Sequence, residues 1–128
     1  MKLGKKGVIM NNELDLKTIK EKWNTFVDER DWKQFHSPKN LATSVSIEAS
    51  ELLELFLWIT PEESRNAMSD PILAGRIKEE VADVFLNLLY LANTLGIDLF
   101  DVMLKKIDVN IEKYPVEKSK GIAKKYGS

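Results

Sequence analysis

Four carboxylates, arranged in two pairs with the same spacing, are the residues of this sequence best suited to chemistry. Glu48 and Glu51 form the first pair, and Glu80 and Asp83 form the second. Residues three apart lie on one side of a helix, so each pair can present two carboxylates in one direction. Carboxylate oxygens, without histidine or cysteine ligands, suit Mg²⁺, with Mn²⁺ as the alternative. We therefore predict that these four residues bind a divalent cation.

Both pairs lie on helices whose apolar residues recur with four-three spacing. Glu48 occupies a position in the middle of the first apolar stripe, between Val45 and Leu52. An unpaired carboxylate at such a position costs several kcal/mol, which favours a cation beside it. Glu80 and Asp83 belong to a narrow polar line on the second helix, and the alternative interpretation of that line alone is a strip facing solvent.

The elements that must position these carboxylates are four predicted helices, over residues 15–29, 41–59, 71–94 and 99–113. No segment alternates apolar and polar residues with a period of two, so we predict no strand. Residues 30–40 form an aromatic-rich loop that ends near Ser37 and Pro38. The predicted fold class is all-α, a single four-helix bundle-like domain over residues 13–128 that follows a flexible leader at residues 1–12.

Composition excludes several other classes of protein. Of the 128 residues, 44% are hydrophobic and 30% are charged, and the net charge of −1 argues against binding to polymeric nucleic acid or to an anionic membrane. The sequence contains no cysteine and one histidine, which excludes a disulfide framework, a thiolate zinc site and a ferritin-like di-iron site. No apolar run approaches the length of a membrane span, and we expect a cytoplasmic protein.

The order of the acidic residues resembles that of a known family. Glu48-Ala-Ser-Glu51 followed by Glu79-Glu80-Val-Ala-Asp83 resembles the E-x-x-E … E-E-x-x-D signature of the MazG-like all-α nucleoside triphosphate pyrophosphohydrolases, and most closely their dCTP pyrophosphatase branch. Matching segments at 29–36, 38–41, 51–58, 106–110 and 113–115 extend the resemblance over about residues 15–126. Two positions depart from the pattern. Ile47 replaces a glutamate of the broader superfamily, and Asn87 stands where the branch can carry a tyrosine.

The resemblance implies an activity and a set of site residues. The four carboxylates would be the catalytic Mg²⁺ ligands, and the reaction would release a monophosphate and pyrophosphate. Substrate contacts would come from eight further residues: Trp32, His36, Asn40, Trp58 and Asn87 toward the base and sugar, and Lys106, Asn110 and Tyr114 toward the phosphates. Members of the family are homodimers or homotetramers whose sites are completed across the interface.

Two alternatives stay open at the level of sequence. The substrate could be another nucleotide such as dUTP rather than dCTP or a modified pyrimidine nucleotide. The chain could also be a non-catalytic helical module that binds a metal in its acidic groove. Of the aromatic residues on the first helix, Trp23 and Phe26 are expected to pack in the core.

Overall fold

The computed structural model describes residues 12–123, with side chains from residue 16 onward. Four long helices account for most of this range, as the sequence predicts: α1 (Asn12–Glu29), α2 (Pro38–Glu54), α4 (Pro71–Thr94) and α5 (Leu99–Lys113). Shorter helical segments lie between and after them: η1 (Lys33–Phe35), α3 (Pro61–Arg65), η2 (Ala67–Ser69) and α6 (Val116–Ser119). No strand occurs in the described range. The expected leader falls almost entirely outside it.

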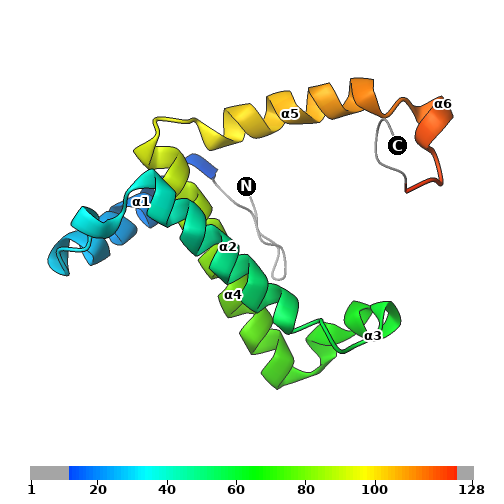
Figure 1. Cartoon of the computed structure of the whole chain (residues 1–128), viewed down its shortest axis with the longest axis horizontal. Helices are drawn as coiled ribbons and strands as arrows, with labels where there is room; N and C mark the ends of the chain where they lie inside the picture. Colours follow the sequence, from blue (N-terminus) through cyan, green and yellow to red (C-terminus); the bar gives the residue numbers. More distant parts are fainter. Residues whose placement is uncertain (1–11, 124–128) are drawn as a thin grey trace.

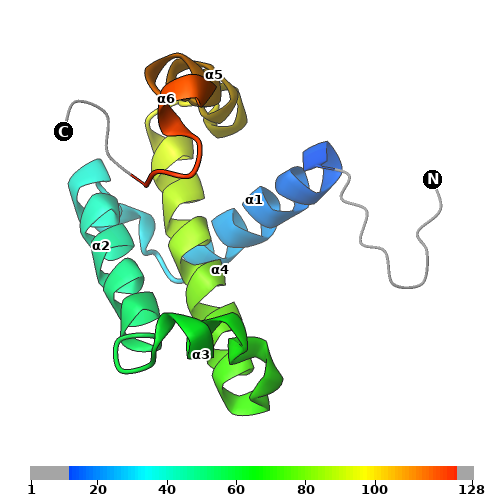
Figure 2. The same cartoon turned by 90° about the vertical axis from the view of Figure 1, so that its right-hand side faces the viewer.

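Helices α2 and α4 form the centre of the molecule. They lie side by side and run antiparallel (Figure 1), while α1 crosses the opposite side of α4 (Figure 2). Val27, Leu41 and Tyr90, one from each of these three helices, form a small buried cluster. This cluster fixes α1 and the beginning of α2 against the C-terminal half of α4.

The C-terminal end of α1 places the first aromatic residue of the expected site. Asp31 adopts a left-handed conformation with φ 54°. The amide of Asp31 donates to the carbonyl of Asp28, and that of Trp32 donates to the carbonyl of Val27. This pair of bonds is the Schellman motif, which is commonly accompanied by an apolar contact across the turn. Here the Trp32 ring packs edge-on against Phe26, with the ring centroids 5.5 Å apart.

The observed limits of α2 differ from the predicted ones at both ends. The helix begins at Pro38, earlier than predicted, because Ser37 accepts a hydrogen bond from the amide of Asn40 and proline suits the first turn. It ends at Glu54 rather than at residue 59. The chain must leave the helix before Thr60, whose extended backbone forms a capping box with Glu63 at the start of α3.

Helix α5 does not close a four-helix bundle within one chain, which corrects the predicted architecture. Gly96, at φ 70°, ends α4, and Asp98 caps α5, so that the two helices meet at an angle of 102° (Figure 1). Leu104, Ile107 and Ile111 on α5 remain 66%, 54% and 64% exposed. These three residues follow a helical stripe, so α5 presents an uncovered apolar face.

Within the described range, no single helix has the length and apolar character needed to cross a membrane. Helices α4 and α5 pass that test of length and composition only as a bent pair.

Candidate functional site

Three of the four predicted ligands meet between α2 and α4. Glu48 of α2 and Glu80 and Asp83 of α4 offer carboxylate oxygens that all lie within 4.8 Å of one another. The antiparallel packing of the two helices brings the two pairs face to face, as their spacing predicts. Glu51, the fourth predicted ligand, is exposed one turn from Glu48 and lies outside this closest group.

The crowding of these acids alters how readily they ionise. The pKa of Glu48 is raised from 4.5 to about 7, mainly by burial and then by the neighbouring carboxylates of Glu51 and Asp83. The pKa of Glu80 is also raised, first by burial and then by the charge of Glu51. Glu51 is therefore close enough to influence both acids. Both raised pKa values reflect the free-energy cost of keeping several ionised carboxylates close together and partly buried.

The cluster fits a divalent cation. One oxygen of Glu48 and one of Glu80 are shielded from solvent and have no hydrogen-bond partner. A polar atom in that position normally has a partner, and an ion is one explanation of the exception. All the available donor atoms are carboxylate oxygens, which Mg²⁺ and Mn²⁺ prefer. The residues present therefore suit the predicted magnesium site.

Two of the predicted base-side residues, His36 and Asn40, lie in and beside the loop that joins α1 to α2. His36 is half-buried and packs edge-on against Tyr90, with ring centroids 5.2 Å apart. The side-chain amide of Asn40 donates to the carbonyl of Phe35 at 2.8 Å. Asn40 thus holds the loop in shape, and its contact with substrate stays a prediction.

The predicted aromatic positions are accessible to different extents. Trp32 is 43% exposed, and Trp58 is 90% exposed in the turn that follows α2. Asn87 lies one turn beyond Asp83 on α4, and its amide nitrogen donates to the carbonyl of Asp83 at 2.8 Å. The side-chain oxygen of Asn87 is not used in this bond.

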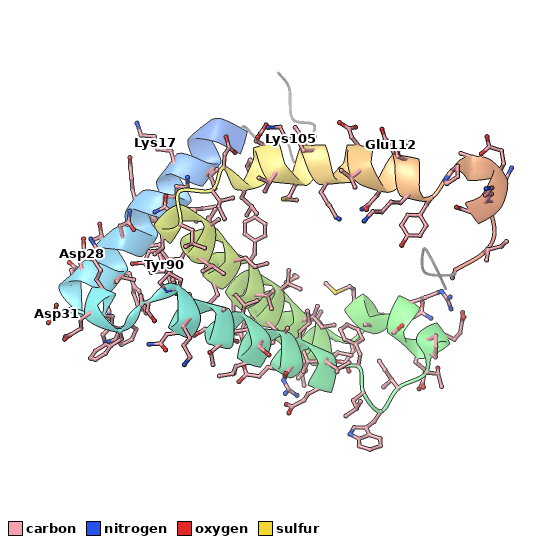
Figure 3. All side chains as sticks on the ribbon, turned by 45° about the horizontal axis from the view of Figure 1, so that its top comes forward. Lys17, Asp28, Asp31, Tyr90, Lys105 and Glu112 are labelled. Atoms are coloured by element: carbon pink, nitrogen blue, oxygen red, sulfur yellow. The ribbon has the colours of Figure 1, made fainter. Side chains whose placement is uncertain are left out.

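One chain does not bring the predicted phosphate-side residues to the carboxylates. Lys106, Asn110 and Tyr114 are exposed on α5 or at its end. Figure 3 shows α5 standing away from α2 and from most of α4. Within the described part of one chain, these residues therefore lie apart from Glu48.

The structure also contains a polar hollow that the sequence analysis did not identify. It lies between α1 and α4, has a volume of about 410 Å³, and is lined by Asn24, Asp28, Lys33, Tyr90, Asn93 and Thr94. Tyr90 and Thr94 belong to the polar line on α4 that also carries Asp83. This shared line is the sequence feature that could have pointed to the hollow. The contribution of α1 could not be anticipated, because helical periodicity does not say where two helices cross.

Comparison with known proteins decides the family. The model of the MazG-like family matches residues 43–128. The chain belongs to the MazG-like family. Among curated members, it is 38% identical over 116 residues to dCTP pyrophosphatase 1 of Bos taurus, covering 91% of this chain and 69% of the relative. It is 36% identical over 114 residues to dCTP pyrophosphatase 1 of Homo sapiens, covering 89% and 67%.

A solved structure of similar sequence shares the fold. A crystal structure of a pyrophosphatase from Archaeoglobus fulgidus superposes with a TM-score of 0.69 at 36% sequence identity. The match covers 84% of this chain and 95% of the archaeal one. The helical arrangement described above is therefore shared with this archaeal pyrophosphatase over most of the chain.

Proposed function

We propose that this protein uses Mg²⁺ to hydrolyse dCTP, or a closely related pyrimidine nucleotide, to the monophosphate and pyrophosphate. The chain is a nucleoside triphosphate pyrophosphatase, as its family and its relatives indicate. The observation that carries the finer proposal is the group of Glu48, Glu80 and Asp83, which combines closely spaced oxygens with shielded atoms that lack partners.

The carboxylates and their neighbours would divide the chemical tasks. When bound, Mg²⁺ supplies positive charge to the phosphate oxygens and to the departing pyrophosphate. Glu48, Glu80 and Asp83 would hold the ion. Glu51 lies outside the closest group but beside it, which leaves its carboxylate able to orient the attacking water and accept its proton. The base would extend away from this end of the site toward the loop that carries Trp32 and His36.

We also propose that the active form is a homo-oligomer, a dimer or a tetramer. The apolar stripe of Leu104, Ile107 and Ile111 is uncovered in one chain, and a face of this kind is typical of an interface. Lys106 and Asn110 lie beside this stripe on α5. Packing of α5 against a second copy would therefore carry these residues, with Tyr114, toward the phosphate side of the second copy's site.

Analysis of the first products tests the proposal. The protein is incubated with dCTP and Mg²⁺, and samples from early time points are separated by anion-exchange chromatography. We expect dCMP and pyrophosphate in equal amounts, and no turnover when EDTA removes the metal. The formation of dCDP and inorganic phosphate as first products would contradict the proposal. Parallel reactions with dUTP and the other nucleoside triphosphates establish the preferred base.

A further inference from the structure

We propose that residues 1–11 bind in a groove between α1, α4 and α5 of their own chain and stabilise the junction of these three helices. The groove, here called the elbow groove, has a volume of about 620 Å³. Its apolar wall is made by Leu16, Leu89, Ile97, Leu99, Phe100 and Leu104. The inference is independent of the proposed function, because none of these residues belongs to the acidic cluster.

The apolar wall of the elbow groove is incompletely covered by the described residues. Ile97 is 42% exposed and Leu104 is 66% exposed, while Leu99 and Phe100 are half-buried. Helices α1 and α5 have little direct contact with each other, and the first turns of α1 diverge from α4 (Figure 2). Exposed apolar surface of this kind commonly marks a contact site. We therefore expect another segment to occupy the groove.

Residues 1–11 are attached at the edge of this groove. They precede Asn12, the first residue of α1, and Leu16 of the groove lies about 6 Å further along that helix. An extended chain spans roughly 3.3–3.6 Å per residue, so these residues are long enough to fold back and cross the groove. A segment tethered in this way is also present at a high effective concentration. Attachment therefore favours this segment over a partner that must bind from solution.

The apolar residues of the segment match the apolar wall of the groove. Val8, Ile9 and Met10 are consecutive and lie just before α1 in the sequence. When the chain folds back, they can reach Leu16 on α1 and Phe100 on α5, which line the groove together. Moving such side chains from water into an apolar groove is favourable.

The charges of the segment suit the α5 side of the groove. The segment contains lysines, including Lys5 and Lys6, and no acidic residue. Asp98 and Asp101 line the groove at the start of α5, whereas Lys20 lies in its α1 wall. Asp101 is already paired with a lysine one turn along α5 at 2.9 Å, but Asp98 has no ion pair with a described residue. Lys5 or Lys6 can supply the missing partner.

A segment bound here leaves the rest of the apolar stripe of α5 to a second copy of the chain. Leu104 lies where the groove and the stripe meet, whereas Ile107 and Ile111 do not line the groove. The segment and the second copy would therefore cover successive parts of α5. The leader expected to be flexible would instead fix the direction of the helix that carries Lys106 and Asn110.

Disulfide formation between introduced cysteines tests the contact directly, because the sequence contains no native cysteine. Ile9→Cys is combined either with Leu104→Cys in the groove or with Val102→Cys. Val102 is 43% exposed, does not line the groove and lies on the opposite side of α5. Under a mild oxidant such as diamide, we expect the Leu104 pair to form an intramolecular disulfide at least tenfold faster than the Val102 pair. Equal rates would overturn the inference, and so would a disulfide between two copies, which would mean that a second copy fills the groove.

Stability measurements on the 128-residue chain give a second test. Ile9→Asp should lower the melting temperature by several degrees, because a charge cannot replace the apolar contact. Ile9→Leu, the matched control, should melt as the parent does. Amide hydrogens in the first two turns of α5 should also exchange faster in Ile9→Asp than in Ile9→Leu. Melting and exchange identical to the parent in Ile9→Asp would overturn the inference, whatever the enzymatic activity of the chain.

Discussion

Glu48 on α2 and Asp83 on α4 present carboxylate oxygens within 4.8 Å of each other, on two helices that pack antiparallel. Like charges this close repel, and the repulsion contributes to the raised pKa of Glu48. Among the described elements, helices α2 and α4 also form the most extensive contact. The main packing contact of the chain therefore contains a group that is unfavourable without a bound cation.

Removing one of these charges should abolish turnover without unfolding the protein. Loss of a metal ligand removes several kcal/mol of charge stabilisation, so we expect kcat/KM of Glu48→Gln and of Asp83→Asn to fall at least about a hundredfold. The melting temperature of the metal-free variants should rise by a few degrees, because a repulsive contact is lost. Glu62→Gln, an exposed acid that pairs with Arg65 on the surface, serves as the control. Near-normal activity of either variant would remove that residue from the ligand set.

The metal-free protein should become less stable as the pH rises from about 5 to about 7. The pKa of Glu48 is about 7 in the folded protein, against 4.5 for an ordinary glutamate. The folded state therefore binds more protons than the unfolded chain in this window, and stability falls as those protons are lost. We expect the melting temperature in EDTA to fall by several degrees more in the parent than in Glu48→Gln.

Saturating Mg²⁺ provides the control for this pH effect. A bound cation replaces the proton as the partner of the carboxylates, so the parent should keep its melting temperature across the same pH range. Calorimetry of the parent and of Glu48→Gln, each with and without Mg²⁺, gives the four curves required. A parent whose stability relative to Glu48→Gln rises with pH in EDTA would contradict the assigned pKa shift.

The sequence predicts some helix limits well because local signals mark them. Asp70 followed by Pro71 begins α4, and Gly96 lies just beyond its end, so both limits are close to the prediction. The predicted end of α2 is wrong for the opposite reason. Leu55 and Ile59 continue the helical spacing of apolar residues through a segment that is a turn. Periodicity reports which residues face the core, and a turn can satisfy it as well as a helix.

Other features depend on contacts that no local pattern contains. The acidic pairs could be matched from sequence because two antiparallel helices have few ways to place them together. The direction of α5 depends on the left-handed conformation of Gly96, and it leaves an apolar face of α5 exposed among the described residues. The polar hollow between α1 and α4 depends on where the two helices cross, which is fixed by the packing of Val27 and Trp23.

Subunit mixing should reveal whether sites are shared between copies. If Glu80 acts in one copy and Lys106 reaches the same site from another, Glu80→Gln and Lys106→Ala are both impaired but complement each other. A randomly mixed dimer should regain about a quarter of the parent activity, since half of the dimers are mixed and each has one intact site. Co-expression with two affinity tags allows the mixed species to be isolated. Activity no greater than the mean of the separate variants would show that the site lies within one chain.

A charge placed in the exposed apolar stripe of α5 should prevent assembly of the oligomer. Ile107→Asp introduces a charge into a face that is 54% exposed at this residue in the single chain. We expect monomers by light scattering, with retained helicity by circular dichroism and greatly reduced turnover. Glu112→Gln, an exposed change on the same helix, should leave both mass and activity unchanged. An active monomer would contradict the proposal of a shared site.

Trp58 follows the end of α2 that is opposite to the Trp32 loop, so in the proposed homo-oligomer it would reach a base at that loop only from a second copy of the chain. Its contribution to base stacking can be measured without a large change in stability. Its side chain is 90% exposed, so Trp58→Ala should leave the melting temperature nearly unchanged. Stacking of a base on an aromatic ring is worth about 1–3 kcal/mol. Its loss in Trp58→Ala should therefore raise KM for dCTP roughly ten- to a hundredfold.

Trp32 packs against Phe26, so Trp32→Ala should show the same increase in KM together with some loss of stability. Tripolyphosphate should inhibit both variants as it inhibits the parent, because it has no base to stack. An unchanged KM in Trp58→Ala, with the mass of the oligomer also unchanged, would exclude this tryptophan from the site and leave base stacking to Trp32.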